Sequence, residues 1–72
     1  MNEAVLIYGK NRCPFTWAAR EAYAASGRTV VYRDVLADPG NLASMLACSG
    51  GNRKIPVIVD GDRVTIGFEG RA

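Results

Sequence analysis

The sequence predicts a small α/β domain with the order β-α-β-α-β-β around a four-stranded mixed sheet. Apolar, β-branched segments alternate with helix-forming ones, and glycine or proline separates most of them. The last two apolar segments flank an Asp-Gly pair, which is typical of a tight antiparallel hairpin. The length of 72 residues fits one domain, expected over residues 1–72.

The first strand is expected over Ala4–Tyr8, a continuous apolar run typical of a strand covered on both faces. Gly9 ends this run, and Pro14 suits the first turn of a following helix. The alanine-rich segment Phe15–Ala25 has strong helix propensity, and Gly27 fits the position that closes the helix. The helix residues expected to face the core are Phe15, Ala18, Ala19, Ala22 and Ser26.

The segment Thr29–Val35 is β-branched and aromatic and predicts a second strand. Because a helix separates it from the first strand, the two strands should be parallel, with a right-handed crossover. Asp38-Pro39 should cap and open a second helix, which Gly50-Gly51 ends. The buried face of this helix is expected to consist of Leu42, Met45, Leu46 and Ser49.

The last pair of strands is expected over Val57–Val59 and Val64–Ile66. Asp60-Gly61-Asp62-Arg63 joins them, and Asp-Gly accepts the positive φ angles of a tight turn. The hairpin therefore adds antiparallel strands to the parallel pair, which makes the sheet mixed.

The composition excludes several classes of function. The net charge is only +2 and no basic block occurs, which argues against a nucleic-acid partner. The longest apolar run is too short for a membrane span or a signal-peptide core, so a cytoplasmic protein is expected. There is no histidine, which rules out Ser-His and Cys-His pairs within the chain, and two cysteines alone cannot close a zinc site. No metal site is expected.

Cys13 stands where the first strand hands over to the first helix. The free amides and positive dipole end of a helix N-terminus favour an anion there, and Lys10 and Arg12 add positive charge. The hydroxyl of Thr16, three residues on, is within reach of a thiolate. Such surroundings lower a cysteine pKa from about 8.5 towards roughly 3.5–7.5. The pattern favours a reactive thiol, while a small packing residue before a proline-started helix is the alternative.

Tyr8-Gly9-Lys10 and Cys13-Pro14-Phe15-Thr16 resemble the active-site segment of glutaredoxins, in which a lysine stands three residues before the reactive cysteine. The resemblance continues through Asp34, the stretch from Ser49 to Pro56, and the region of Gly67. It implies a thioredoxin-like fold that lacks the C-terminal helix of glutaredoxins. It also implies a thiol-disulfide oxidoreductase that reduces glutathione mixed disulfides through Cys13, assisted by Thr16 and Lys10.

Two departures from the family pattern matter for the mechanism. Thr16 replaces the second cysteine of the common CPYC motif, so a two-thiol mechanism within the motif is ruled out. The family's glycine pair and acidic residue are reduced to Gly67-Phe68-Glu69-Gly70. These features are similar to the short UXX-star glutaredoxin-like proteins, whose members can carry selenocysteine at the position of Cys13. The alternatives left open are a glutathione-independent thiol reductase or selenoprotein-type peroxidase, and an iron–sulfur cluster-binding module.

The resemblance also implies where glutathione, the expected cosubstrate, would bind. Ile55-Pro56 would form a cis peptide bond facing Cys13 and pair with an extended thiol substrate, although sequence statistics alone favour an ordinary trans proline at a strand start. The residues implied for binding are Lys10, Phe15, Arg53, Ile55, Pro56 and Gly67, with Lys54 as a further cation. The expected partners are glutathione and thiol or disulfide proteins, with no nucleic acid and no membrane.

Cys48, Trp17 and Phe68 allow two interpretations each. Cys48 either resolves a mixed disulfide on Cys13 or, as the odds favour, is a small, partly buried packing residue. Trp17 and Phe68 either pack in or around the core or help to form an apolar face, left open by the missing closing helix, through which the chain forms a homodimer.

Overall fold

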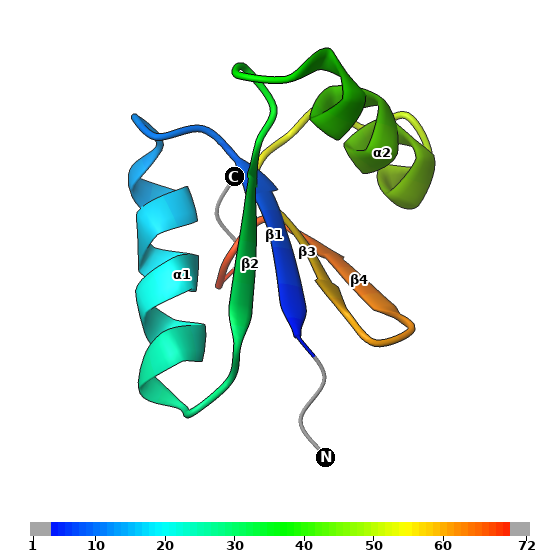
Figure 1. The fold of residues 1–72 in the computed structure, drawn as a ribbon. Helices are drawn as coiled ribbons and strands as arrows, with labels where there is room; N and C mark the ends of the chain where they lie inside the picture. Colours follow the sequence, from blue (N-terminus) through cyan, green and yellow to red (C-terminus); the bar gives the residue numbers. More distant parts are fainter. Residues whose placement is uncertain (1–3, 70–72) are drawn as a thin grey trace.

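The computed structural model of the protein describes residues 4–69. The sheet has the strand order β2-β1-β3-β4, in which β1 is parallel to β2 and antiparallel to β3, and β3 is antiparallel to β4. Figure 1 shows the two helices on either side of this sheet. The predicted α/β order and mixed sheet are confirmed, and no helix follows the last strand within the described residues. The elements are β1 Val5–Gly9, α1 Pro14–Ala25, β2 Val30–Asp34, α2 Pro39–Ser49, β3 Val57–Asp60 and β4 Arg63–Ile66.

The two faces of the sheet carry separate parts of the core. Because side chains alternate along a strand, Ile7 faces α1 and Tyr8 faces α2. On the α1 face the buried residues are Val5, Ile7, Ala19 and Ile58, with Tyr23, Val30 and Phe68 packed against them. On the α2 face they are Tyr8, Val35, Met45 and Val57, with Leu6, Leu42, Leu46, Ile55 and Val59 around them.

The ends of α2 follow the sequence prediction. The Asp38 side chain accepts a hydrogen bond from the Gly40 amide at 2.8 Å and caps the N-terminus, and Pro39 occupies the first helical position. Gly50 closes the helix in the left-handed conformation at φ 68°. Met45 is the fully buried residue of this helix, with Leu42 and Leu46 partly buried beside it, as predicted.

The predicted core-facing stripe of α1 is confirmed at Ala19 and was wrong at Ala18, Ala22 and Ser26. The buried residues are Thr16 and Ala19, and Tyr23 packs against the same cluster, whereas Ala18, Ala22 and Ser26 are exposed. Alanine carries little information about which side of a helix is buried, because it is tolerated on both sides. The register is set instead by the fit of Thr16 against β1, which the apolar pattern does not reveal.

The apolar face that the missing closing helix was expected to leave open is partly covered by Phe68, two residues after the end of β4. Phe68 packs against the α1-side cluster, where Val5, Ile7 and Ile58 are at most 1% exposed. Phe68 therefore covers part of the apolar surface on the α1 side of the sheet. Exposed apolar side chains lie elsewhere, at Trp17, Leu36, Val64 and Ile66.

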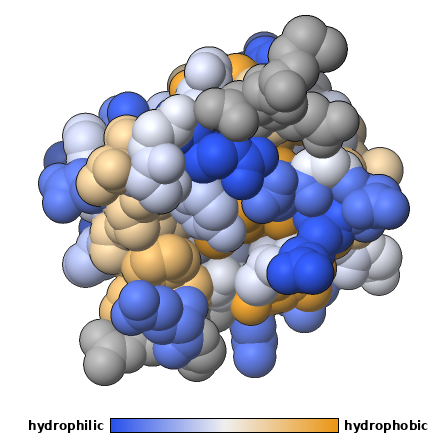
Figure 2. Space-filling view, turned by 90° about the horizontal axis from the view of Figure 1, so that it is seen from below, coloured by the Kyte–Doolittle hydropathy of each residue, from blue (hydrophilic) through white to orange (hydrophobic). Residues whose placement is uncertain are grey.

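The end of the sheet at the β3–β4 hairpin carries many polar side chains. Arg28, just before β2, pairs with Asp60 at the end of β3 with a nitrogen–oxygen distance of 2.7 Å. Hydrophilic side chains cover much of this end, with hydrophobic ones between them (Figure 2). Among residues 4–69, no helix is both long and apolar enough to cross a membrane.

Candidate active site

Four segments meet at the carboxyl end of β1. The strand register pairs Gly9 with Asp34 on one side, and the β1–β3 pairing ends at Tyr8 and Val57, so Pro56 comes next to Gly9 on the other side. The Gly67 amide donates a 2.7 Å hydrogen bond to the Pro56 carbonyl. The Ile55–Pro56 peptide bond is cis, as the resemblance implied. The loop between β1 and α1 starts at Gly9, beside Asp34 and Pro56, and ends at Cys13.

Thr16 fixes α1 closely against the end of β1. Its side chain is fully buried, and a Cβ added to Gly9 would lie 2.5 Å from Thr16 Cγ2. Only glycine at the last position of β1 allows this approach, because any larger residue would displace the helix start. The helix N-terminus is thereby held over the end of the strand, with Cys13 as its N-cap residue.

The surroundings of Cys13 favour its ionised form. The residue is 7% exposed, and burial alone would raise the pKa of its thiol. The Thr16 hydroxyl, the Thr16 and Phe15 amides and the charge of Lys10 together outweigh burial, and the net pKa is lowered. Among residues 4–69, the Cys13 side chain makes no capping hydrogen bond, and the buried Thr16 Oγ1 has no hydrogen-bond partner. These donors are therefore free to satisfy a thiolate.

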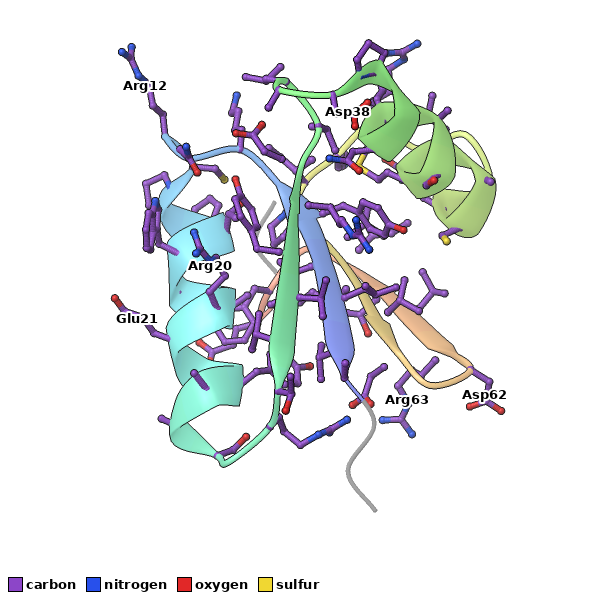
Figure 3. The ribbon with its side chains drawn as sticks, viewed as in Figure 1. Arg12, Arg20, Glu21, Asp38, Asp62 and Arg63 are labelled. Carbon is purple, nitrogen blue, oxygen red and sulfur yellow. The ribbon has the colours of Figure 1, made fainter. Side chains whose placement is uncertain are left out.

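The cations predicted around the thiol do not act equally. Lys10 is exposed and its charge helps to lower the pKa of Cys13. Arg12, by contrast, extends away from the molecule at the outside of the loop (Figure 3). Arg53 and Lys54 are exposed in the segment that leads to Pro56.

The apolar residues implied for substrate binding also lie near the carboxyl end of β1. Phe15 is partly buried in the first turn of α1. Ile55 packs against the α2-side core, while Pro56 is almost fully buried. Gly67 is buried opposite Pro56. The structure thus brings a thiol, an extended backbone edge and exposed cations to one end of the sheet.

A family model described as Glutaredoxin matches residues 5–64. The chain belongs to the glutaredoxin family. This is a family of thiol-disulfide oxidoreductases, which agrees with a lowered thiol pKa at a helix N-terminus. Among curated proteins, no significant match is found.

Solved structures of glutaredoxin-like proteins share the fold. The glutaredoxin grx-1 from Archaeoglobus fulgidus is 23% identical, with a TM-score of 0.78 over 90% of this chain and 75% of that one. NrdH-redoxin from Escherichia coli is 27% identical, with a TM-score of 0.77 over 93% of this chain and 86% of that one. The latter is described as a glutaredoxin-like protein with a thioredoxin-like activity profile.

Cys48, the other cysteine of this glutaredoxin-family chain, belongs to the opposite face of the sheet. It lies on α2 close to the hydroxyl of Tyr8, whose pKa is raised by burial and then by the nearby Cys48. Both cysteines are free. The prediction that Cys48 is a partly buried packing residue was wrong, because its side chain is exposed. Met45 is the buried residue of α2, and Cys48 lies outside the apolar face of the helix.

The sequence reasoning missed a group of side chains next to the glutaredoxin motif. Arg20 stacks on the Trp17 ring and on the Tyr32 ring, with its guanidinium carbon 4.2 Å and 4.0 Å from the two ring centroids. The spacing of Trp17 and Arg20, three residues apart on one helix, is the signal that could have found half of this group. Tyr32 lies on β2, and only the fold brings it to the helix.

Proposed function

We propose that this chain is a single-cysteine thiol-disulfide oxidoreductase that reduces mixed disulfides of glutathione through Cys13. The observation that carries the proposal is the set of donors around the Cys13 sulfur, which lowers its pKa although the residue is buried. A thiolate is the attacking species in disulfide exchange. Thr16 stands where a second motif cysteine would be, and Cys48 lies on the other face, so no second thiol of the described chain flanks Cys13.

The reaction has two balanced exchange steps. The Cys13 thiolate attacks the glutathione sulfur of a mixed disulfide, the substrate thiolate leaves and takes up a proton, and a Cys13–glutathione disulfide forms. The thiolate of a second glutathione then attacks the sulfur of the bound glutathione. Oxidised glutathione leaves, and the Cys13 thiolate is restored.

The residues at the end of the sheet supply positions for glutathione in this proposal. The peptide edge at Ile55-Pro56 lies next to the end of β1 and offers main-chain groups to an extended ligand. Lys10, Arg53 and Lys54 are exposed cations suited to the two carboxylates of glutathione. In this proposal Phe15 lies on the apolar side of the bound glutathione, and Gly67 lies at the end of the molecule farthest from Cys13.

A second candidate is a glutathione-independent reductase that receives electrons from another thiol donor. Gly67-Phe68-Glu69-Gly70 stands in place of the glycine pair and acidic residue with which the family holds the γ-glutamyl end of glutathione, and Phe68 packs against the α1-side cluster. The likeness to NrdH-redoxin, with its thioredoxin-like activity profile, supports the same candidate.

The two candidates are separated by turnover of one substrate with two electron donors. A glutathionylated peptide is reduced with glutathione plus glutathione reductase, and in parallel with a thioredoxin reductase and NADPH. The proposal expects turnover with glutathione that rises with its concentration, and little with the flavoprotein. Turnover with thioredoxin reductase alone would transfer the function to the second candidate.

A further inference from the structure

The Trp17–Arg20–Tyr32 group lines an open pocket on the side of α1 that faces β2. The pocket has a volume of about 240 Å³, enough for a side chain but not for a folded segment. Its walls are Trp17, Arg20, Glu21, Ala24, Val30 and Tyr32. None of these residues is required by the exchange steps proposed above.

Arg20 is prepared in this pocket to receive an anion. Its guanidinium plane is held against two aromatic rings, so its orientation is fixed before any ligand arrives. No hydrogen bond or ion pair joins Arg20 to another residue between positions 4 and 69, so its in-plane N–H donors have no protein acceptor there. A stacked guanidinium with free edges matches the planar, two-oxygen geometry of a carboxylate.

Glu21, the acidic residue of the pocket wall, forms no ion pair with Arg20 within residues 4–69. Figure 3 shows Glu21 extending outward from α1, whereas Arg20 extends towards β2. Trp17, which is 43% exposed, gives the pocket an apolar wall, and its indole nitrogen donates to the Asn11 carbonyl, which fixes the ring. The pocket thus combines one oriented cation with an aromatic surface.

The pocket lies close enough to Cys13 to contact the same substrate. Arg20 lies seven positions after Cys13 along α1, a rise of about 10 Å, and helical side chains lean back towards the N-terminus. Tyr32 stacks on Arg20 and also lies near Cys13. The pKa of its hydroxyl is raised first by burial, then by Asp34, and to a smaller extent by the charge of Cys13. An extended peptide covers this distance in about two or three residues.

We propose that the Trp17–Arg20–Tyr32 pocket is a subsite for the carboxylate of an aspartate or glutamate placed two or three residues from the disulfide cysteine of a protein substrate. The inference rests on the proposed function and adds its substrate class. The acidic residue binds Arg20 while the substrate disulfide meets Cys13, so the pocket selects acidic segments around the target cysteine.

The test compares two glutathionylated peptides that differ only in Glu or Gln three residues from the cysteine. The wild-type protein should reduce the Glu peptide with a kcat/KM about five- to twentyfold higher, mainly through KM, which is typical of one oriented charge pair. Arg20→Met should remove this preference and leave the Gln peptide unchanged. Raising the salt concentration should reduce the wild-type preference.

Arg63→Met is the matched control, because it removes the same charge at the hairpin, away from the N-terminal end of α1 (Figure 3). The preference should survive this substitution. Equal rates for the two peptides with wild type, or equal loss of preference in both variants, would overturn the proposal. A higher KM for glutathione in Arg20→Met, with no peptide preference, would assign the pocket to glutathione and overturn it as well. Absence of turnover with either peptide would instead contradict the proposed function.

Discussion

The two cysteines of this chain occupy opposite kinds of surroundings. Cys13 is nearly buried at the start of α1, where a hydroxyl, two amides and a lysine charge favour its thiolate. Cys48 is exposed near the end of α2, beside Tyr8, whose pKa is raised first by burial and further by Cys48. The helix start offers free amide donors, whereas the helix end offers carbonyl oxygens. Low exposure therefore does not prevent ionisation of Cys13, because hydrogen-bond donors surround its sulfur.

The glycines near the two cysteines also differ in how tightly they are packed. Gly9 lies against Thr16 so closely that no Cβ fits, whereas Gly50 and Gly51, just after Cys48, have open space around them. The Cys13 side is held rigidly by packing between strand and helix. The Cys48 side only needs glycines for their positive φ angles.

The largest effect should separate the two thiols outright. Cys13→Ser removes the nucleophile, so reduction of a glutathionylated peptide should fall by about a thousandfold or more. Cys48→Ser is the matched control, and its rate should stay within about twofold of wild type. A large loss in Cys48→Ser would make Cys48 a resolving thiol and end the contrast.

Gly9→Ala should damage the Cys13 side through its packing. The added methyl overlaps Thr16 and should lower the free energy of unfolding by about 1–3 kcal/mol in a urea titration. Gly51→Ala carries only the cost of a positive φ, about 1 kcal/mol. Only Gly9→Ala should also slow alkylation of Cys13, and the double variant Gly9→Ala/Thr16→Ala should recover part of the stability. Full stability in Gly9→Ala would refute the close approach.

Thr16→Val tests the hydroxyl at nearly constant shape. Losing a donor to the thiolate, worth about 1.5–3 kcal/mol, should raise the pKa of Cys13 and slow its alkylation at pH 7 by about tenfold. The rate at pH 10, where the thiol is ionised in both proteins, should be unchanged. An unchanged pH profile would remove Thr16 from the mechanism.

The smallest effect concerns stability against pH. A thiol whose pKa is lowered by folding stabilises the folded state when ionised. This contribution is complete above the unfolded-state pKa, about 8.5, and is lost as the pH falls through the folded-state value. The excess stability of wild type over Cys13→Ser should therefore grow as the pH rises towards about 8.5 and then level off. A difference that shrinks over this range would contradict the direction of the pKa shift.

The sequence predicted element boundaries well where the local backbone conformation accepts only a few residue types. Asp38-Pro39, Gly50 and the Asp60-Gly61 turn predicted the ends of α2 and the hairpin, because caps and positive φ angles select few residues. The alanines of α1 did not predict its buried face, because alanine fits either side. The predicted junction of strand and helix indicated Cys13, and the resemblance to glutaredoxins strengthened that prediction and added Pro56.

The rest of the site depends on contacts between distant segments. Nothing local to Gly9 shows that Thr16 will lie on it, and nothing local to Tyr32 shows that Arg20 will stack on its ring. The outward direction of Arg12 likewise follows from the loop path and not from its place next to Cys13. The sequence placed both Lys10 and Arg12 near Cys13, and only the structure shows that Lys10 acts on the thiol while Arg12 points away from it.

Mapping the glutathione adduct tests the central claim most directly. The reduced protein is treated with oxidised glutathione near pH 6.5, where few ordinary thiols are ionised, and peptide masses then locate the added glutathione. The account predicts glutathione on Cys13, with Cys48 still free. Glutathione on Cys48 with Cys13 unmodified, or a disulfide between the two cysteines, would contradict it.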